Sequence, residues 1–472
     1  MRYGFALLLA VLILISGCVQ DSENETSNQT MNESLNQTPG GGTDECQVIN
    51  EQCCMGNYCV GAYEGYCPED GIETVFIECD FDRCLPVLDC KRIGEPKPEE
   101  HENITTPELE ETDPRPSLPP CEGNHVFTRS PIDIENIFSI YPLGGLNPSG
   151  HTFPTDHIYF FIVSTIPGDD YSDMKEVTVY SPGDMLVTGI SMSEHVDEDF
   201  TDYMLYFSPC KDVAGYFIHL SSISEELEQI FTEPYDNCNE YTTGNHEYRN
   251  CEKVIEYHLS AGDVVGTAGR RGPLDLGMYD YRITHERANP VRWEMHDKSI
   301  YTVCPIDYFT QDLADILEPM LGSTDGSIKS EEPACGTIYQ DIARTAQGIW
   351  FTEDVPMDSL YTFPEDPHLA LVHDAVEKGK AVFSVGTSGK DLPVGKYYFN
   401  PQSSGKVNRD FSDIVPGEIY CFETENEWGD KKNDFTIILE LTSETTLKIQ
   451  KRSSSSCGSG PWSFSDPAVF ER

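Results

Sequence analysis

Positive charge is the scarcest feature of this sequence. The 472 residues include 31 Lys and Arg against 81 Asp and Glu, a formal net charge of −50 at pH 7. Phosphate binding needs a basic surface, so nucleic acid is excluded as a general partner, and contact with anionic headgroups is disfavoured. Acidity on this scale fits a well-solvated surface protein.

Motifs that would define several functional classes are also missing. The sequence has no EF-hand loop, so its acidity does not indicate a calcium sensor. It has no Gly-x-Ser-x-Gly elbow with matching His and Asp, which argues against a serine hydrolase. No Cys-x-x-Cys pair stands opposite a second one or a His-x-x-x-His, which disfavours a structural zinc site. His368 and His373 are five residues apart, a spacing that suits neither a helix face nor a strand face.

The N-terminal residues predict export. Arg2 precedes an apolar run over residues 5–15, which is short for a membrane-spanning helix but suits a secretory signal. Its end, Ile15-Ser16-Gly17-Cys18, resembles a lipobox, which implies cleavage after residue 17 and a lipid on Cys18. We therefore expect a signal peptide over residues 1–17 and a lipid-anchored protein on the outer side of the cell membrane; an uncleaved anchor is the alternative.

Two polar segments and a cysteine-rich segment follow. Residues 18–43 are poor in apolar side chains and predict a disordered stalk, and the Pro/Glu-rich residues 94–120 predict an extended linker. Between them, residues 44–93 predict a small disulfide-rich module. Sequons in the stalk and in the linker predict glycosylation at Asn24, Asn28, Asn32, Asn36 and Asn103. Sequons together with a lipobox suggest an archaeal cell envelope.

The cysteines support an oxidising location. One of the 17 cysteines is Cys18. Of the other 16, eight lie in the small module and eight lie downstream of it, so each group has an even number. Exported chains favour disulfides, so we expect both sets to be paired. The downstream set begins at Cys121 and includes Cys335, for which a structural role is predicted.

The rest of the chain predicts a mostly β protein. Residues 159–163, 177–180, 203–207 and 216–220 are apolar or alternating segments typical of strands, and residues 435–449 alternate as a hairpin with a turn near Ser443. Two short helices are expected: one capped by Ser222 and Glu225, and one over residues 311–320. Trp350 is expected in the core, with an exposed sugar-binding edge as the alternative. We expect one β domain over residues 121–330 and a C-terminal β-rich domain over residues 331–472.

A quasi-repeat and a histidine motif carry a family resemblance. Pro182–Gly189 and Ala261–Gly269 each pair a Gly-Asp turn with a short apolar strand, and Gly215–Ile223 contains Tyr-Phe-Ile-His-Leu-Ser. Together they resemble the lysostaphin-type zinc endopeptidase domain over residues 121–285. This resemblance implies a duplicated, barrel-sandwich-like fold and a zinc site built from His-x-x-x-Asp and His-x-His motifs.

The resemblance implies a partial site. His219 matches the loop histidine that assists catalysis. Metal-ligand candidates are His151, Asp156, His157 and Asp275, although His151 and Asp156 are one residue further apart than the family spacing. Asp275 and Gly277 stand where the family has His-x-His, so one ligand position offers nothing to a metal.

This departure decides between two expectations. The first is a non-catalytic cell-surface protein that uses the peptidase-like domain for binding or scaffolding, with an envelope polymer or surface-layer protein as partner and no cofactor. The alternative is a zinc-dependent endopeptidase that acts on envelope peptides with an altered ligand set. The sequence favours the first, because catalytic zinc needs three protein ligands and an open position.

Overall fold

The computed structural model describes residues 118–472 except 167–173, 197–199, 244–245, 271, 291–297, 354, 356–364 and 427–430, together with the backbone of five short strands. The chain divides into two compact units, of which one is Asp21–Thr112 and the other contains Asp113–Arg472. The unit Asp21–Thr112 holds a three-stranded sheet, β1-β2-β3, and a β4-β5 pair. The strands are β1 (Gln47–Ile49), β2 (Gln52–Met55), β3 (Tyr58–Gly61), β4 (Glu78–Asp80) and β5 (Leu85–Val87). The predicted disulfides of the small module lie outside the described residues.

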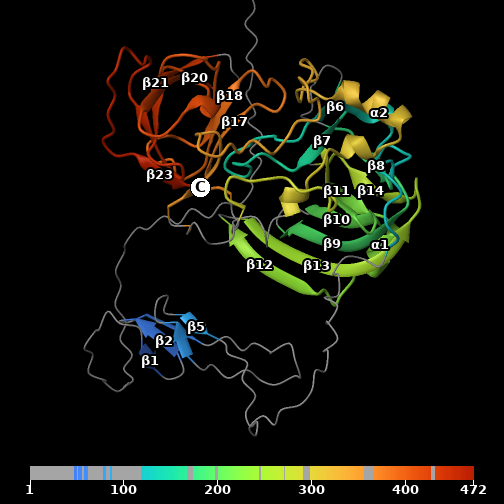
Figure 1. The fold of residues 1–472 in the computed structure, drawn as a ribbon. Coiled ribbons are helices and arrows are strands. Elements are labelled where there is room, and N and C mark those ends of the chain that lie inside the picture. The colour runs from blue at the N-terminus through green and yellow to red at the C-terminus, as the bar shows by residue number, and fades with distance from the viewer. Residues whose placement is uncertain are drawn as a thin grey trace, which may run out of the picture. The chain divides into compact units, whose positions relative to one another are not determined.

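Residues 118–340, which we call the sheet domain, are built on a ten-stranded antiparallel sheet (Figure 1). Its main strand order is β12-β13-β9-β10-β11-β15-β7-β6, and β14 pairs with both β11 and β8. The strands are β6 (Ile137–Tyr141), β7 (His157–Ile162), β8 (Val177–Tyr180), β9 (Met185–His195), β10 (Phe200–Cys210), β11 (Val213–Ile223), β12 (Asn237–Thr243), β13 (His246–Leu259), β14 (Val264–Ala268) and β15 (Leu274–Asp280).

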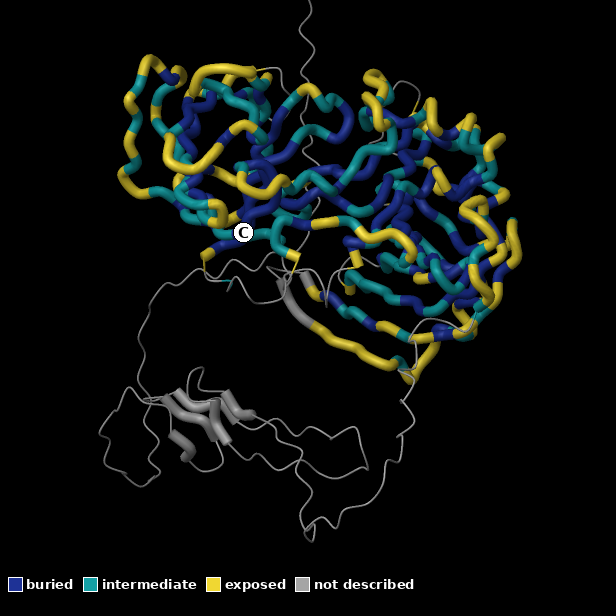
Figure 2. The backbone as a smooth tube through the Cα atoms, in the orientation of Figure 1, coloured by how far each residue is buried: buried dark blue, intermediate teal, exposed yellow. Residues whose placement is uncertain are grey.

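The core of the sheet domain lies between its central strands and the segments that fold over them. Phe160, Phe207, Phe217 and Leu276 are fully buried there, as the apolar runs predicted. Figure 2 shows the central strands as a mixture of buried and intermediate residues, whereas the described residues 237–240 of β12 are exposed. The outer strand β12 is nevertheless joined to β13 by the Cys238–Cys251 disulfide.

The two predicted Gly-Asp turns lie side by side. The Ser181 amide donates to the Asp263 carbonyl at 2.8 Å, and the Gly262 amide donates back to the Ser181 carbonyl at 2.9 Å. The Ala261 amide donates to Oδ1 of Asp184 at 3.0 Å. The quasi-repeat therefore corresponds to two turns that cap the same end of the sheet domain.

Two short α-helices accompany the sheet. Helix α2 (Gln311–Leu317), extended by a 3-10 turn (Glu318–Met320), agrees with the prediction for residues 311–320. Helix α1 (Glu225–Ile230) is capped by Ser224, whose hydroxyl accepts from the Leu227 amide at 3.4 Å. The predicted capping residue, Ser222, is wrong because it still belongs to β11 and its hydroxyl contacts Thr267.

Residues 341–472 form a closed eight-stranded barrel, in which each strand pairs with its sequence neighbour and β23 returns to β16. Trp350 on β16 is fully buried, and its Nε1–H donates to the Ala346 carbonyl at 2.9 Å, which confirms the core role. The strands are β16 (Gly348–Thr352), β17 (Leu369–His373), β18 (Ala381–Val385), β19 (Gly395–Phe399), β20 (Ile419–Glu425), β21 (Lys432–Leu441), β22 (Thr446–Arg452) and β23 (Ala468–Glu471).

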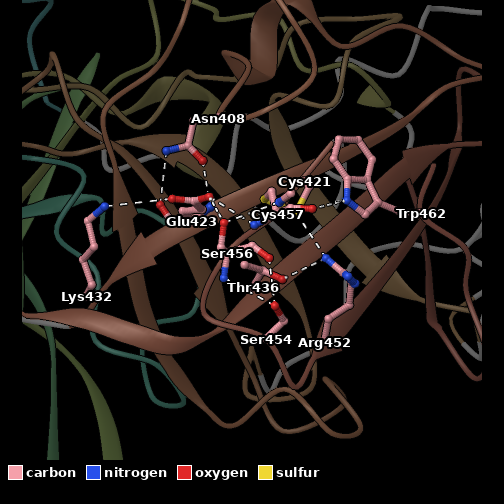
Figure 3. Close-up of a disulfide and its surroundings, with 11 residues drawn as sticks. Asn408, Cys421, Glu423, Lys432, Thr436, Arg452, Ser454, Ser456, Cys457 and Trp462 are labelled. Carbon is pink, nitrogen blue, oxygen red and sulfur yellow. Dashed lines mark hydrogen bonds and ion pairs between the residues drawn. A yellow bond between two sulfur atoms is a disulfide. The ribbon is translucent and has the colours of Figure 1, made fainter. Parts of the chain in front are cut away.

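All eight cysteines downstream of the small module are paired. The pairs are Cys121–Cys210, Cys238–Cys251, Cys304–Cys335 and Cys421–Cys457. Figure 3 shows how the last pair fastens the segment after β22 to β20 of the barrel. Beside it, Glu423 accepts from the Cys457 amide at 3.0 Å, and the Trp462 indole N–H donates to the Cys457 carbonyl at 2.7 Å. The mostly β fold and the disulfide pairing expected for this part of the chain are thus confirmed.

Candidate functional site

A row of polar side chains crosses one face of the sheet domain. In the strand registers Asn239 of β12 faces Asn250 of β13, Asn250 faces Ser193 of β9, and Ser193 faces Asp202 of β10. Directly opposed residues of antiparallel strands project to the same face. These four side chains therefore begin a row that runs from the sheet edge toward β11.

His219 continues the row because β11 carries a bulge. Tyr203 pairs with Leu220 and Leu205 pairs with Phe217, so β11 has one more residue than β10 between these positions. His219 lies in this bulge with a φ of 64°, a left-handed conformation that is rare and strained for a non-glycine residue. Its Nδ1–H donates to Asp202 Oδ2 at 2.8 Å, and 38% of its side chain is exposed.

Asp275 of β15 and His157 of β7 complete the row. Asp275 Oδ2 lies 3.5 Å from His219 Nε2 and 3.4 Å from His157 Nε2, and both Asp275 and His157 are buried. Among the described residues, neither His157 Nε2 nor Asp275 Oδ1 has a hydrogen-bond partner, although both atoms are buried. Buried polar atoms without partners are unfavourable in a fold, so they mark a place for a ligand, ion or ordered water.

The row favours a protonated His219. Burial lowers the pKa of His219, but attraction to Asp275 and the hydrogen bond to Asp202 outweigh that effect and raise the pKa to about 9. Burial raises the pKa of Asp275 to about 6, although His219 and His157 act against the rise. The centre of the row is thus an imidazolium flanked by carboxylates, and it is partly open to solvent at His219.

Asp156, the predicted metal ligand before β7, is held by two tyrosines. Tyr216 donates to Asp156 Oδ1 at 2.6 Å and Tyr279 donates to Oδ2 at 2.7 Å. Burial raises the pKa of Asp156, but hydrogen bonds from His157 and the two tyrosines outweigh it and lower the pKa to about 2. Both carboxylate oxygens are therefore engaged within the protein.

Gly277 explains how Tyr216 reaches Asp156. In the registers Gly277 of β15 lies between Tyr216 of β11 and His157 of β7. A Cβ atom at position 277 would lie 2.1 Å from the Tyr216 ring, because the ring occupies the space above the glycine. The resemblance places one histidine of the His-x-His pair at this position, and the Tyr216 ring leaves no room for such a side chain.

His151 lies beside the row. Its ring centroid is 5.7 Å from that of His157, and its backbone pairs with Asn147. Burial, followed by repulsion from His157, lowers the pKa of His151 to about 4, so the imidazole is neutral at pH 7. A neutral imidazole is able to accept a hydrogen bond or bind a metal, which an imidazolium cannot do.

The residues present do not fit the zinc site that the resemblance implies. Position 277 has no room for a ligand, and both oxygens of Asp156 are hydrogen-bonded. Within the part of residues 118–472 that the structure describes, no three His, Cys, Asp or Glu side chains form a group able to hold a metal ion.

The barrel supports the segment that carries His151 and Asp156. Phe153 of that segment stacks on His368 at the start of the barrel strand β17, with ring centroids 5.5 Å apart and planes 8° apart. The Phe153 amide donates to Glu365 at 3.0 Å, and the ring belongs to an apolar cluster with Phe351 and Val372 of the barrel. His368 is thus a buried packing residue that helps to position the site.

The structure brings together all five predicted site residues of the sheet domain: His151, Asp156, His157, His219 and Asp275. Asp202, Tyr216 and Tyr279 were missed. Tyr216 is the first residue of the Tyr-Phe-Ile-His-Leu-Ser motif, but its contact with Asp156 follows only from the strand register that places it opposite Gly277. The lipidation site Cys18 and the predicted glycosylation sites Asn24, Asn28, Asn32, Asn36 and Asn103 lie outside the described residues.

Comparisons with known proteins identify no relative: no protein-family model, no curated protein and no solved structure matches this chain. In the part of the chain that the structure describes, no helix has the length and apolar character needed to cross a membrane.

Proposed function

We propose that this protein is a lipid-anchored cell-surface protein whose sheet domain binds an envelope component through the polar row, without peptidase activity. The anchor is the lipid expected on Cys18, followed by a glycosylated stalk. The envelope component is a polymer or a surface-layer protein, and nucleic acid is not a partner, since the net charge is −50.

One observation carries the preference for binding over catalysis. The Tyr216 ring occupies the space above Gly277, and its hydroxyl bonds to Asp156 at 2.6 Å. A single side chain thereby engages the candidate ligand Asp156 and fills the space of one histidine of the implied His-x-His pair. What remains is a partly open row of hydrogen-bonding groups, which suits recognition of a polar ligand.

Zinc content and peptide cleavage test this proposal. The full-length protein is purified in detergent without chelator, zinc per chain is measured by mass spectrometry, and cleavage of a quenched-fluorescent Gly/Ala peptide is followed. The same measurements are made on His151→Ala and His219→Ala. We expect no stoichiometric zinc and no cleavage in any of the three. Stoichiometric zinc that is lost in His151→Ala, with cleavage lost in both variants, would overturn the proposal.

A zinc-dependent endopeptidase with an altered ligand set is the second candidate. It is favoured by the buried, unpartnered Nε2 of His157 and Oδ1 of Asp275. The contacts of Asp275 with His157 and His219, at 3.4 and 3.5 Å, are also longer than charge-assisted hydrogen bonds. A zinc ion held by His157, Asp275 and His219 would supply Lewis-acid chemistry for peptide cleavage. His219, Asp275 and His157 would have to rotate toward a common point.

A further inference from the structure

A cavity of about 400 Å³ opens on the sheet domain beside the histidines of the row. It lies over β9 to β13, with Ile218 of β11 in its lining, and shares four residues with the row: Asn239, Asn250, Ser193 and Asp202. The Asp202 carboxylate therefore both lines the cavity and holds His219. Small-molecule sites have volumes of this size and larger. The Cys238–Cys251 disulfide keeps the outer strand β12 in place along its rim.

The lining of this cavity is rich in amides and carboxylates. Asn237, Asn239 and Asn250 line it together with Asp202 and Glu252, and none of its lining residues is Lys or Arg. A side-chain amide both donates and accepts hydrogen bonds, which matches a hydroxyl group that does the same. Phosphate, sulfate or carboxylate groups on a ligand would find no positive partner in the lining and would face two acidic residues.

Two residues that line the cavity each carry a buried acceptor atom without a hydrogen-bond partner among the described residues. Oδ1 of Asn250 and Oδ1 of Asp202 both lack a hydrogen-bond partner among the described residues. Ser193 lies between the two residues in the strand registers, so both acceptors belong to one short stretch of the row. A ligand that satisfied both atoms would present two neighbouring O–H or N–H donors.

The backbone under the cavity is already used in the sheet. Strands β12, β13, β9 and β10 are paired in sequence across it, so their inward amides and carbonyls bond to one another. A peptide that bound by strand addition would pair with the outer edge of β12, outside this floor, and not with the backbone inside the cavity. Recognition here depends on side chains, with Met204 supplying an apolar surface beside the polar groups.

We propose that this cavity binds an uncharged saccharide unit, whose adjacent hydroxyls donate to Asn250 and Asp202 and whose ring carbons lie against Met204. This inference rests on the proposed binding function and names its ligand class. A sugar chain of the cell envelope would then enter across the exposed strand β12 and end beside His219.

The test is calorimetric titration of the full-length protein with chitohexaose and mannohexaose. Hexagalacturonate serves as an anionic control, and a Gly/Ala hexapeptide serves as the peptide control. The variants are Asn250→Leu and Asn239→Leu; Asn239 is exposed, so its replacement leaves the core intact. Asn400→Leu, at an exposed asparagine of the barrel, is the matched control.

We expect at least one neutral hexasaccharide to bind, with affinity about tenfold weaker in each cavity variant and unchanged in Asn400→Leu. The saccharide inference is overturned if neither neutral sugar binds, if hexagalacturonate binds as well as they do, or if Asn400→Leu weakens binding as much. Binding of the hexapeptide alone would overturn the saccharide and leave the binding function standing. Zinc-dependent cleavage of that peptide would overturn the proposed function itself.

Discussion

The sheet domain and the barrel each contain a His–Asp pair, and the two pairs differ in what surrounds them. In the barrel, His373 Nδ1–H donates to the Lys378 carbonyl at 2.8 Å, and Nε2 lies 3.3 Å from Asp410. In the sheet domain, His219 sits between two carboxylates with a strained backbone, and buried atoms nearby have no partner. A similar pair thus has its bonds satisfied within the barrel, whereas the pair in the sheet domain lies beside buried atoms without a partner among the described residues. This difference is the reason why we propose the binding function for the sheet domain.

The largest effects should come from removing disulfides, and they should differ between the regions. The Cys421–Cys457 bond of the barrel spans 36 residues, whereas the Cys238–Cys251 bond of the sheet domain spans 13. Replacing both cysteines with alanine should lower the unfolding free energy by about 4 kcal/mol in the barrel and about 3 kcal/mol in the sheet domain. The reason is that the unfolded chain regains more conformational entropy when a longer loop is opened. Denaturant unfolding of each double variant measures this. A larger loss at Cys238–Cys251 would contradict the ranking.

The next effect concerns the glycine under Tyr216. Gly277→Ala should destabilise the sheet domain by about 1–3 kcal/mol, because the new Cβ would meet the Tyr216 ring. Gly379→Ala in the barrel is the matched control, since nothing lies within 4 Å of its added Cβ, and it should change stability by less than about 0.5 kcal/mol. Urea unfolding of both variants compares them.

A double-mutant cycle separates this clash from a general intolerance of position 277. In a Tyr216→Ala background, Gly277→Ala should be much less destabilising, because the ring that occupies the space is gone. An equal loss with and without the tyrosine would show that another contact limits this position.

The smallest effect on stability is expected from neutralising the aspartate partners. Burial lowers the pKa of His219, but its carboxylate partners outweigh burial and raise this pKa to about 9. The hydrogen bond to Asp410 raises the pKa of His373. A histidine with a raised pKa stabilises the fold below about pH 6.5 and loses this contribution as the pH rises through the raised value. For His219 the loss falls between about pH 6.5 and pH 9.

NMR titration of the two imidazole Cε1–H resonances measures these shifts. Asp202→Asn and Asp410→Asn should each lower the pKa of the histidine concerned. The pKa of His219 should fall less far, because Asp275 remains near its Nε2. A full return of His219 to its ordinary value in Asp202→Asn would show that Asp275 contributes nothing.

Local sequence patterns predicted much of the fold and part of the site. Alternation over residues 435–449 matched β21 and β22, since period-two burial is visible in the sequence. The closure of the barrel, which pairs Thr352 with Phe470, could not be predicted, because nothing local specifies a contact between residues so far apart. The same limit applies to the site. His219 was found from its motif, but Asp202 depends on a bulge, and the bridge from Tyr216 over Gly277 depends on the register of three strands.

The most direct test of the central claim, that the row binds a polar ligand and is not a zinc centre, is a zinc titration observed at the histidines themselves. The Cε1–H resonances of His157 and His219 are followed at pH 7 as zinc is added to the full-length protein. We expect both to stay unchanged at one equivalent, because the raised pKa of His219, about 9, keeps its imidazole protonated, and because no three His, Cys, Asp or Glu side chains of the described residues form a group able to hold a metal. Stoichiometric shifts of both resonances that disappear in Asp275→Asn would contradict it.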